Sequence, residues 1–179
     1  MRRLIPIVSL LVGLLLLIAS NSLHAQSVCE AIKKCDLTDL KSHLSNRSDI
    51  DSLQFDSNEK TALMVAAEAG CISIVIYLLE NNSDVDKVSE FGETALKFAV
   101  RENHKDIVEL LINHGANIDN SEDEYGSSLI SAAFNGNHEL TRILIKAGAD
   151  VNREGFLPPI EINNCMFSGG TPLMFAAVN

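Results

Sequence analysis

A pattern that repeats at one fixed interval constrains this chain more than any other feature. Three periods open on a hydroxyl residue and close on Asp or Asn. The opening residues are Thr61, Thr94 and Ser127, the closing residues are Asp86, Asp119 and Asn152, and both sets are evenly spaced. The interval of roughly 33 residues lies in the range of about 20 to 50 that is typical of solenoids, in which similar structural units stack in a row. We therefore predict a stacked array over this region.

Each period contains two stretches in which apolar residues follow a helical spacing. In the second period the first stretch is short and includes Leu96, Ala99 and Val100, whereas the second stretch, residues 107–112, is bulkier. Between the two stretches stands a residue that tolerates the left-handed backbone conformation at a helix end. These residues are Gly70, Asn103 and Gly136. The pattern predicts helix, turn, helix and loop in each unit, with the opening hydroxyl residue as a cap of the first helix. Neither helix can bury its apolar face without a neighbouring unit.

The motifs inside each period resemble those of the ankyrin-repeat family. That family has Thr-Pro-Leu-His-x-Ala-Ala, then Gly-His, Ile-Val-x-x-Leu-Leu and Gly-Ala-Asp-Val-Asn. This chain has TALMVAA, TALKFAV, SSLISAA and TPLMFAA, with Asn103-His104, GANID and GADVN. The resemblance covers residues 61–152 in three full units. It implies an all-α solenoid of helix-turn-helix units joined by short hairpin loops.

The motifs divide the chain into five expected parts. These are a signal peptide over 1–25, a degenerate and more polar N-terminal capping repeat over 26–58, three full repeats over 59–152, an inserted loop over 153–170, and a truncated fourth repeat over 171–179. The step from Ser127 to Thr171 is longer than the earlier steps, so an insertion precedes the fourth unit. The fourth unit has only its first helix, which leaves the apolar face of the third unit poorly covered. We expect either that the chain continues beyond Asn179, which we favour, or that a partner caps this end.

The N-terminus has the pattern of an exported protein. Arg2 and Arg3 precede a mostly apolar run, residues 4–19, and a short polar stretch ends at Ala25. This is the pattern of a cleaved secretory signal peptide, and the apolar run is shorter than the about 20 residues of a membrane-spanning helix. An uncleaved N-terminal anchor stays open as an alternative. Because ankyrin arrays of eukaryotes are mostly intracellular, we expect export to a bacterial periplasm, with secretion or membrane anchoring as alternatives.

The charge of the mature chain limits its partners. Without Arg2 and Arg3 the chain has 12 Lys and Arg residues against 24 Asp and Glu residues, a formal net charge of −12. Such a surface repels phosphate backbones and anionic lipids. We expect no nucleic-acid partner, and no membrane insertion unless the signal segment is uncleaved.

Four cysteines follow the signal peptide: Cys29, Cys35, Cys71 and Cys165. Export permits disulfides, and the absence of a CxxC motif argues against a redox or zinc motif. Cys29 and Cys35 are nearest in sequence, but on one helix they would be about 9 Å apart along the axis, too far for a bridge. A bridge between them stays open if the helix ends at Cys35. We expect instead that the cysteines are buried thiols that act as small apolar residues.

No sequence motif for catalysis is found. The mature chain lacks GxSxG, HExxH, GxxxxGK[ST] and GxGxxG. The acidic run 119–126 lacks the Gly and Glu that an EF-hand calcium loop has at its sixth and twelfth positions. His104 occupies the Gly-His position, where the resemblance implies hydrogen bonds between neighbouring loops, and we expect structural roles for His43, His114 and His138 too. The expectation is therefore no enzyme activity, no cofactor and no metal.

The resemblance also implies a protein-binding surface. Ankyrin arrays bind partners on a concave face formed by hairpin tips and exposed positions of the first helices, which here include Lys60 and Glu68. The residues that we assign to the binding face are Glu90, Phe91, Glu93, Arg101, Glu102, Asp123, Glu124, Tyr125, Phe134 and Asn135. Phe91 and Phe134 are candidate aromatic anchors, although each could instead pack against its own neighbours. The carboxylates beside them favour a basic partner.

These observations favour a non-enzymatic scaffold of the bacterial cell envelope that binds an unidentified partner protein. The alternative is that the chain is the targeting half of a longer protein whose activity lies beyond Asn179.

Overall fold

The computed structural model describes residues 25–44, 59–120, 126–155, 160–162, 165–167 and 170–173. Residues 25–33 are helical. The further elements, in chain order, are α2 (Leu37–Leu44), α3 (Ala62–Ala69), α4 (Ile72–Glu80), α5 (Ala95–Arg101), α6 (Lys105–Asn113), α7 (Ser128–Phe134), α8 (His138–Lys146), β1 (Ile160–Ile162) and β2 (Cys165–Phe167).

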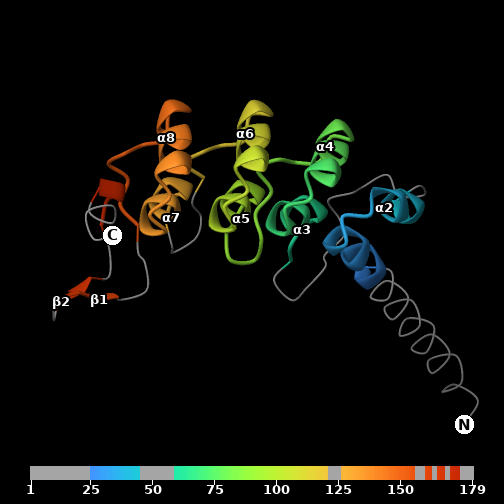
Figure 1. The fold of residues 1–179 in the computed structure, drawn as a ribbon, viewed down its shortest axis with the longest axis horizontal. Coiled ribbons are helices and arrows are strands. Elements are labelled where there is room, and N and C mark those ends of the chain that lie inside the picture. Colours follow the sequence, from blue (N-terminus) through green and yellow to red (C-terminus); the bar gives the residue numbers. More distant parts are fainter. Residues whose placement is uncertain are drawn as a thin grey trace, which may run out of the picture.

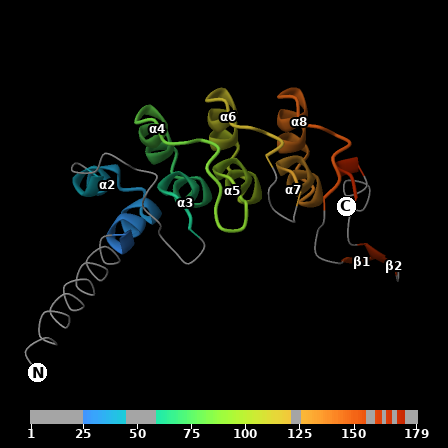
Figure 2. The ribbon, with the colours of Figure 1, turned by 180° about the vertical axis from the view of Figure 1, so that it is seen from behind.

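The helices stack as a row of two-helix units (Figure 1). The first helices of the units, α3, α5 and α7, lie side by side in one layer, and the second helices, α4, α6 and α8, lie in another, as the reverse view also shows (Figure 2). Each first helix packs against the second helix of its own unit, and α5 packs against both α3 and α7. The predicted helix-turn-helix solenoid is confirmed. The signal peptide is predicted over residues 1–25, of which 1–24 lie outside the described residues.

The first helix of each full unit begins where the sequence predicts. The side-chain oxygens of Thr61, Thr94 and Ser127 each accept a hydrogen bond from the backbone N–H three residues later, at 3.3 to 3.4 Å. Each bond satisfies an N–H group that has no partner inside the helix. The predicted caps are confirmed.

A continuous apolar core runs between the two layers of helices. Ala66, Ala99 and Ala132 occupy the same position in successive units, and each is 0 % exposed. Their small side chains allow neighbouring first helices to approach closely, whereas bulkier residues such as Ile74 and Ile107 fill the space under the second helices. Burial of these faces requires the adjacent unit, as expected for a solenoid.

Contacts between the turns of successive units form a column along the array, which we call the turn column. Its three pairs are Cys35 with Cys71, Gly70 with His104, and Asn103 with Asn137. The first residue of each pair has a left-handed backbone, with φ of 53°, 75° and 62° respectively. The second residue of each pair stands at the N-terminus of the next second helix, α4, α6 or α8. The predicted left-handed turns at Gly70, Asn103 and Gly136 are confirmed.

Two pairs of the turn column are joined without a covalent bond. His104 donates from Nε2 to the carbonyl oxygen of Glu68 at 3.2 Å, which confirms its expected role between neighbouring loops. A side chain at Gly70 would begin 2.6 Å from the His104 ring, so this position requires glycine for space as well as for its φ. At the next interface Asn137 donates from its side-chain amide to Oδ1 of Asn103.

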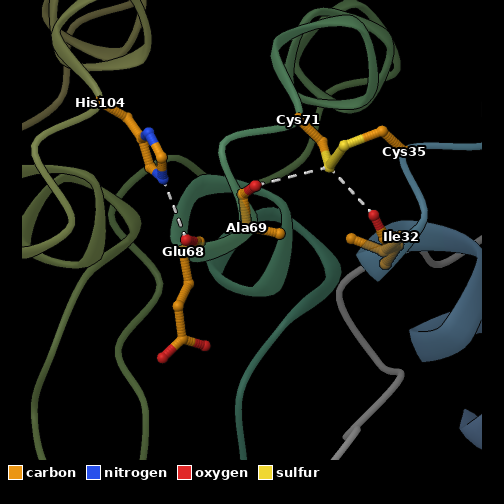
Figure 3. Close-up of a disulfide and its surroundings, with 6 residues drawn as sticks. All are labelled: Ile32, Cys35, Glu68, Ala69, Cys71 and His104. Atoms are coloured by element: carbon orange, nitrogen blue, oxygen red, sulfur yellow. Dashed lines mark hydrogen bonds between the residues drawn. A yellow bond between two sulfur atoms is a disulfide. The ribbon is translucent and has the colours of Figure 1, made fainter.

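The prediction that all the cysteines are buried thiols is wrong for Cys35 and Cys71, which form a disulfide with a Cα–Cα distance of 5.2 Å (Figure 3). The sequence separation of 36 residues obscures the pairing in the sequence. The stacking of units brings the two turns together. Cys35 is the left-handed residue between the helix at 25–33 and α2, and Cys71 stands at the N-terminus of α4. Cys29 is a half-buried free thiol rather than the partner of Cys35.

Charged side chains link successive units elsewhere at a similar spacing. Asp86 accepts a hydrogen bond from the N–H of Asn117 at 2.8 Å, and Asp119 accepts one from the N–H of Asp150 at 3.1 Å. The hydrogen bond from Lys105 to Glu139, followed by the negative charge of Glu139, raises the pKa of Lys105 above its usual value. The Asp86 and Asp119 contacts repeat because these two carboxylates occupy equivalent positions in successive units.

Two glycines, Gly155 and Gly170, pair with each other near the two ends of the inserted segment. Gly155 and Gly170 exchange two backbone hydrogen bonds of 3.1 Å, and beyond them β1 and β2 pair in antiparallel register, with Glu161 opposite Met166. A Cβ at Gly155 would lie 2.7 Å from the Cα of Gly126, so the backbones of the two tips touch. Figure 1 shows β1 and β2 on the side of the array where the loop before α5 also projects. The insert therefore contains a short hairpin.

One end of the array exposes apolar side chains. Ile145 is 46 % and Val151 44 % exposed, whereas Ile112 and Ile118, which hold the same positions in the preceding unit, pack against the core. With Leu173 these residues line a groove of about 350 Å³. The expected poor cover of the third unit's face is therefore observed among the described residues.

Replacement of Ser83 by alanine should raise the free energy of unfolding by about 1 kcal/mol. The Ser83 hydroxyl is buried and has no hydrogen-bond partner among the described residues, and the equivalent positions hold Ala116 and Ala149. Urea unfolding followed by circular dichroism measures the change. Ser89→Ala is the matched control, because the buried Ser89 hydroxyl accepts a bond from the N–H of Glu93 and its loss should destabilise the protein. If Ser83→Ala instead lowers the free energy of unfolding, the Ser83 hydroxyl is not an unsatisfied buried group and the prediction is wrong.

Candidate protein-binding face

The structure describes seven of the ten residues assigned to the binding face. Asp123, Glu124 and Tyr125 lie outside the described residues. The other seven come from the loop before α5, from the end of α5 and the residue after it, and from the end of α7 and the residue after it. They are Glu90, Phe91, Glu93, Arg101, Glu102, Phe134 and Asn135.

A short turn presents Phe91 to solvent. The N–H of Ser89 donates to the carbonyl of Glu93 at 2.9 Å, and the N–H of Gly92 donates to the carbonyl of Ser89 at 2.9 Å. Gly92 has a φ of 75°, which allows the chain to reverse direction. Phe91 stands in this turn and is 53 % exposed. Because hydrogen bonds close the turn around Phe91, the backbone of the turn places this residue at the surface.

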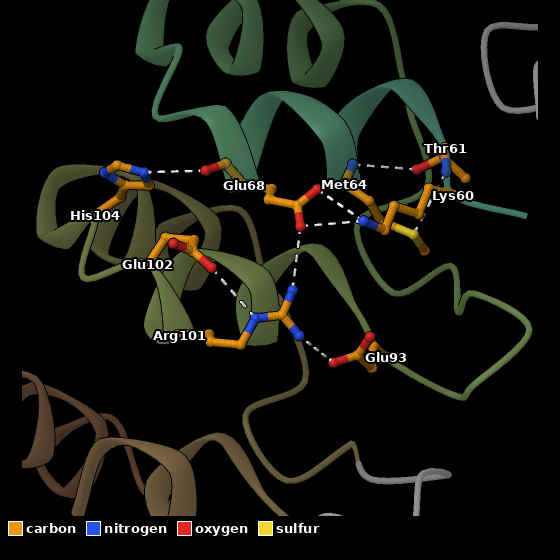
Figure 4. Close-up of polar contacts among 8 residues, drawn as sticks. All are labelled: Lys60, Thr61, Met64, Glu68, Glu93, Arg101, Glu102 and His104. Carbon is orange, nitrogen blue, oxygen red and sulfur yellow. Dashed lines mark hydrogen bonds and ion pairs between the residues drawn. The ribbon is translucent and has the colours of Figure 1, made fainter. Parts of the chain in front are cut away.

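Arg101 lies at the centre of an ion-pair network that joins two units (Figure 4). Its guanidinium donates to Glu93 at 2.7 Å and to Glu68 at 3.2 Å, with a weaker contact to Glu102 at 3.4 Å. Glu68 is also paired with Lys60 at 2.8 Å. Three residues assigned to partner binding, Glu93, Arg101 and Glu102, therefore belong to one network.

The side chains of Lys60 and Arg101 also lie over a buried aromatic ring. Lys60 Nζ and Arg101 Cζ are each 4.7 Å from the centroid of the Phe98 ring, and Phe98 itself is 0 % exposed. A cation over an aromatic face is attracted by the negative charge density of the ring. The network is thus anchored both by carboxylates and by the core. The sequence did not single out Phe98, although its position in the helix TALKFAV could have indicated a buried ring below Arg101.

Among the described residues of this face, carboxylates outnumber cations. Two cations, Lys60 and Arg101, face three carboxylates, Glu68, Glu93 and Glu102, and the exposed Glu90 adds a fourth near Phe91. Because Arg101 is held by three carboxylates, it offers little positive charge to an incoming anion. The face is therefore better suited to attract a positive group than a negative one.

The second candidate anchor, Phe134, is half-buried and packs against Ile130 and Ala133. Asn135, which follows α7, is exposed. Phe134 and Phe91 therefore differ in exposure, since Phe91 is the more exposed of the two.

Lys97 fixes one hairpin tip to the preceding unit. This residue lies on the first helix of the second unit, is buried, and donates to the carbonyl of Gly126 at 2.8 Å.

Among the described residues, no group of three or more His, Cys, Asp or Glu side chains is arranged to hold a metal ion. In the same part of the chain, no helix has both the length and the apolar character needed to cross a bilayer.

Replacement of Glu68 by glutamine should lower the free energy of unfolding by about 0.5 to 1 kcal/mol at low salt, because it weakens the pairs with both Lys60 and Arg101. The loss should shrink in 1 M salt, roughly the concentration at which the Debye length falls to about 3 Å. Urea unfolding at two salt concentrations measures it. Glu102→Gln removes only the contact at 3.4 Å and serves as the control. Equal effects of the two substitutions would show that Glu68 does not join the units.

The comparisons with known proteins agree with this architecture. The family model described as ankyrin repeats (3 copies) matches residues 16–122 and 81–155, which together span more than half of the chain. A search of curated proteins found no match. The repeat register, the capped first helices and the family match lead to one conclusion: the chain belongs to the ankyrin-repeat family.

Proposed function

We propose that this protein is a non-enzymatic scaffold of the bacterial cell envelope that binds a partner protein around Phe91. Ankyrin repeats generally mediate protein–protein interactions, which supports the general part of the proposal. The specific part rests on one observation, the exposed ring of Phe91 on a turn closed by backbone hydrogen bonds.

The energetics of Phe91 support its role as an anchor. An aromatic side chain in the centre of an interface often contributes about 2 kcal/mol or more to binding. Since the backbone at Phe91 is already fixed by its turn, binding would order mainly the side chain, and less conformational entropy would be lost than for a mobile loop. The neighbouring Arg101 network is likewise held in place before a partner arrives.

The charges around Phe91 favour a basic partner. Glu90 lies next to Phe91, and the Arg101 network carries more carboxylates than cations. The negative charge would raise the association rate of a basic partner, and salt would reduce this increase. An acidic partner would meet repulsion from this surface as well as from the whole chain, whose formal net charge is −10.

The disulfide supports the proposed location. Disulfides persist in oxidising compartments such as the periplasm and are rare in the cytosol. The Cys35–Cys71 pair is consistent with the signal-peptide pattern at the N-terminus. Both features favour export of the chain.

A photo-crosslinking amino acid at position 91 tests the binding face. We expect it to capture one partner protein in intact cells, and Phe91→Ala to lower the affinity of the purified partner by at least about tenfold. The control position is Ile76, an apolar residue of α4 that is 39 % exposed and lies in the layer of second helices. Capture of the same protein from both positions, or unchanged affinity of Phe91→Ala, would refute the assignment of this face.

Export has a separate test, so that its failure can be distinguished from failure of the binding face. The mature chain should begin at Gln26 and be found in the periplasmic fraction, with Cys35 and Cys71 protected from alkylation until a reductant is added. N-terminal sequencing and thiol labelling measure these properties. A chain that retains Met1 in the cytoplasm with alkylated cysteines would contradict export.

A further inference from the structure

The disulfide differs in kind from the other contacts of the turn column. At equivalent positions the array uses a His ring against Gly70 and an amide hydrogen bond between Asn103 and Asn137. These contacts form without any covalent chemistry. Among the described residues, only the first interface, which joins the capping unit (residues 25–44) to the full repeats, depends on the oxidation state of its pair.

The two cysteines are unequally exposed. Cys35 is an exposed residue, whereas Cys71 is 2 % exposed and stands at the N-terminus of α4. We therefore expect an incoming thiolate to attack at Cys35 rather than at Cys71. Cys71 is also suited to leave, because the N-terminal end of a helix stabilises a developing negative charge.

We propose that Cys35–Cys71 is a thiol-exchange site at which a thiol reductant enters through Cys35 and releases the capping unit from its covalent link. The thiolate attacks Cys35 Sγ and forms a mixed disulfide. The Cys35–Cys71 bond breaks, and its electron pair leaves on Cys71, which takes a proton from water. A second thiol of the reductant then displaces Cys35, which is also protonated. In total, one dithiol is oxidised to a disulfide and two protein thiols are formed.

The reduced protein has an alternative contact available at the same place. Cys71 Sγ lies 3.0 Å from the carbonyl oxygen of Ile32 in the capping unit (Figure 3). In the disulfide this sulfur has no hydrogen to donate, but the Cys71 thiol formed by reduction has one. The new S–H to Ile32 bond would join two units at this place, as the bond from His104 to Glu68 does one unit further on. Reduction thus exchanges a covalent link for a weak hydrogen bond.

The capping unit is the part that should respond to this exchange. It contributes Val28, Ile32 and Leu40 to the core, but it lies at one end of the described row of helices, so another described unit packs against it on one side only. Moreover, Cys35 holds a left-handed backbone, φ 53°, that a non-glycine residue adopts at a cost. Once the bridge is reduced, the capping unit should open more often while the following units stay folded.

The entry point is tested by mass spectrometry with reduced glutathione as the probe. In a Cys29→Ser/Cys165→Ser protein, treatment with glutathione followed by acid quenching should trap a glutathione adduct on Cys35. Peptide mapping identifies the modified cysteine. An adduct found mainly on Cys71, or a bridge that neither glutathione nor dithiothreitol reduces in the folded protein, would overturn the proposal.

The opening is tested by hydrogen exchange in the same protein, with and without dithiothreitol. Amides of residues 25–44 should exchange faster on reduction by on the order of a hundredfold, as expected for the loss of a link across about 36 residues. Amides of α5 and α6 should change by less than about twofold. Unchanged exchange in residues 25–44, or equal acceleration throughout the array, would refute a local release of the capping unit.

A variant that copies the next interface provides the matched control. Cys35→Gly/Cys71→His reproduces the pair Gly70 and His104 at the first interface. Exchange of its residues 25–44 should be insensitive to dithiothreitol. If this variant responds to dithiothreitol as strongly as the parent protein, the response does not arise from Cys35–Cys71 and the proposal fails. If the variant does not fold, the comparison of oxidised and reduced parent protein still decides the outcome.

Discussion

Each unit of this array is held to the next at the turn between its two helices, and the stack depends on that contact. The left-handed residue of one unit meets the residue just before the next second helix, whether the chemistry is a disulfide, a His ring over glycine or an amide pair. A helix pair with one buried face cannot fold alone. The turn column lies at the same place in each unit, beside the apolar faces that successive units bury against one another.

The same stacking organises the surface proposed for binding. Lys60 and Glu68 belong to the first full unit, and Arg101 belongs to the second, yet their side chains form one network above Phe98. Stacking therefore creates a charged surface that neither unit has by itself. The arginine and its carboxylates link the two units across that surface, and Phe91 stands beside it as an exposed apolar group. A charged surface linked in this way, with an aromatic side chain beside it, is suited to binding another protein, since linked groups lose less freedom on association.

The sequence predicted the features that depend on local chemistry. Thr61, Thr94 and Ser127 cap their helices because a hydroxyl at that position satisfies a free N–H regardless of the rest of the fold. Gly70, Asn103 and Gly136 turn the chain because they tolerate a positive φ. Phe91 was assigned to the surface from its place in the repeat and is exposed, whereas Phe134, assigned by the same reasoning, is half-buried against Ile130 and Ala133. The position in the repeat predicted on which side of the array each ring lies, but not which residues each ring packs against.

By itself, then, the sequence determined the repeat period, the helix ends and the helix-turn-helix solenoid, because the motifs that specify them recur in each repeat unit. It did not predict the β1–β2 hairpin of the insert, which lies outside the repeat pattern. Only the tertiary structure decided which cysteines are joined and which charges are paired. Cys35 and Cys71 have a sequence separation of 36, and Arg101 and Glu68 one of 33. Such partners meet because the units stack in register, and the distance between two side chains in adjacent units depends on that packing rather than on their separation along the chain.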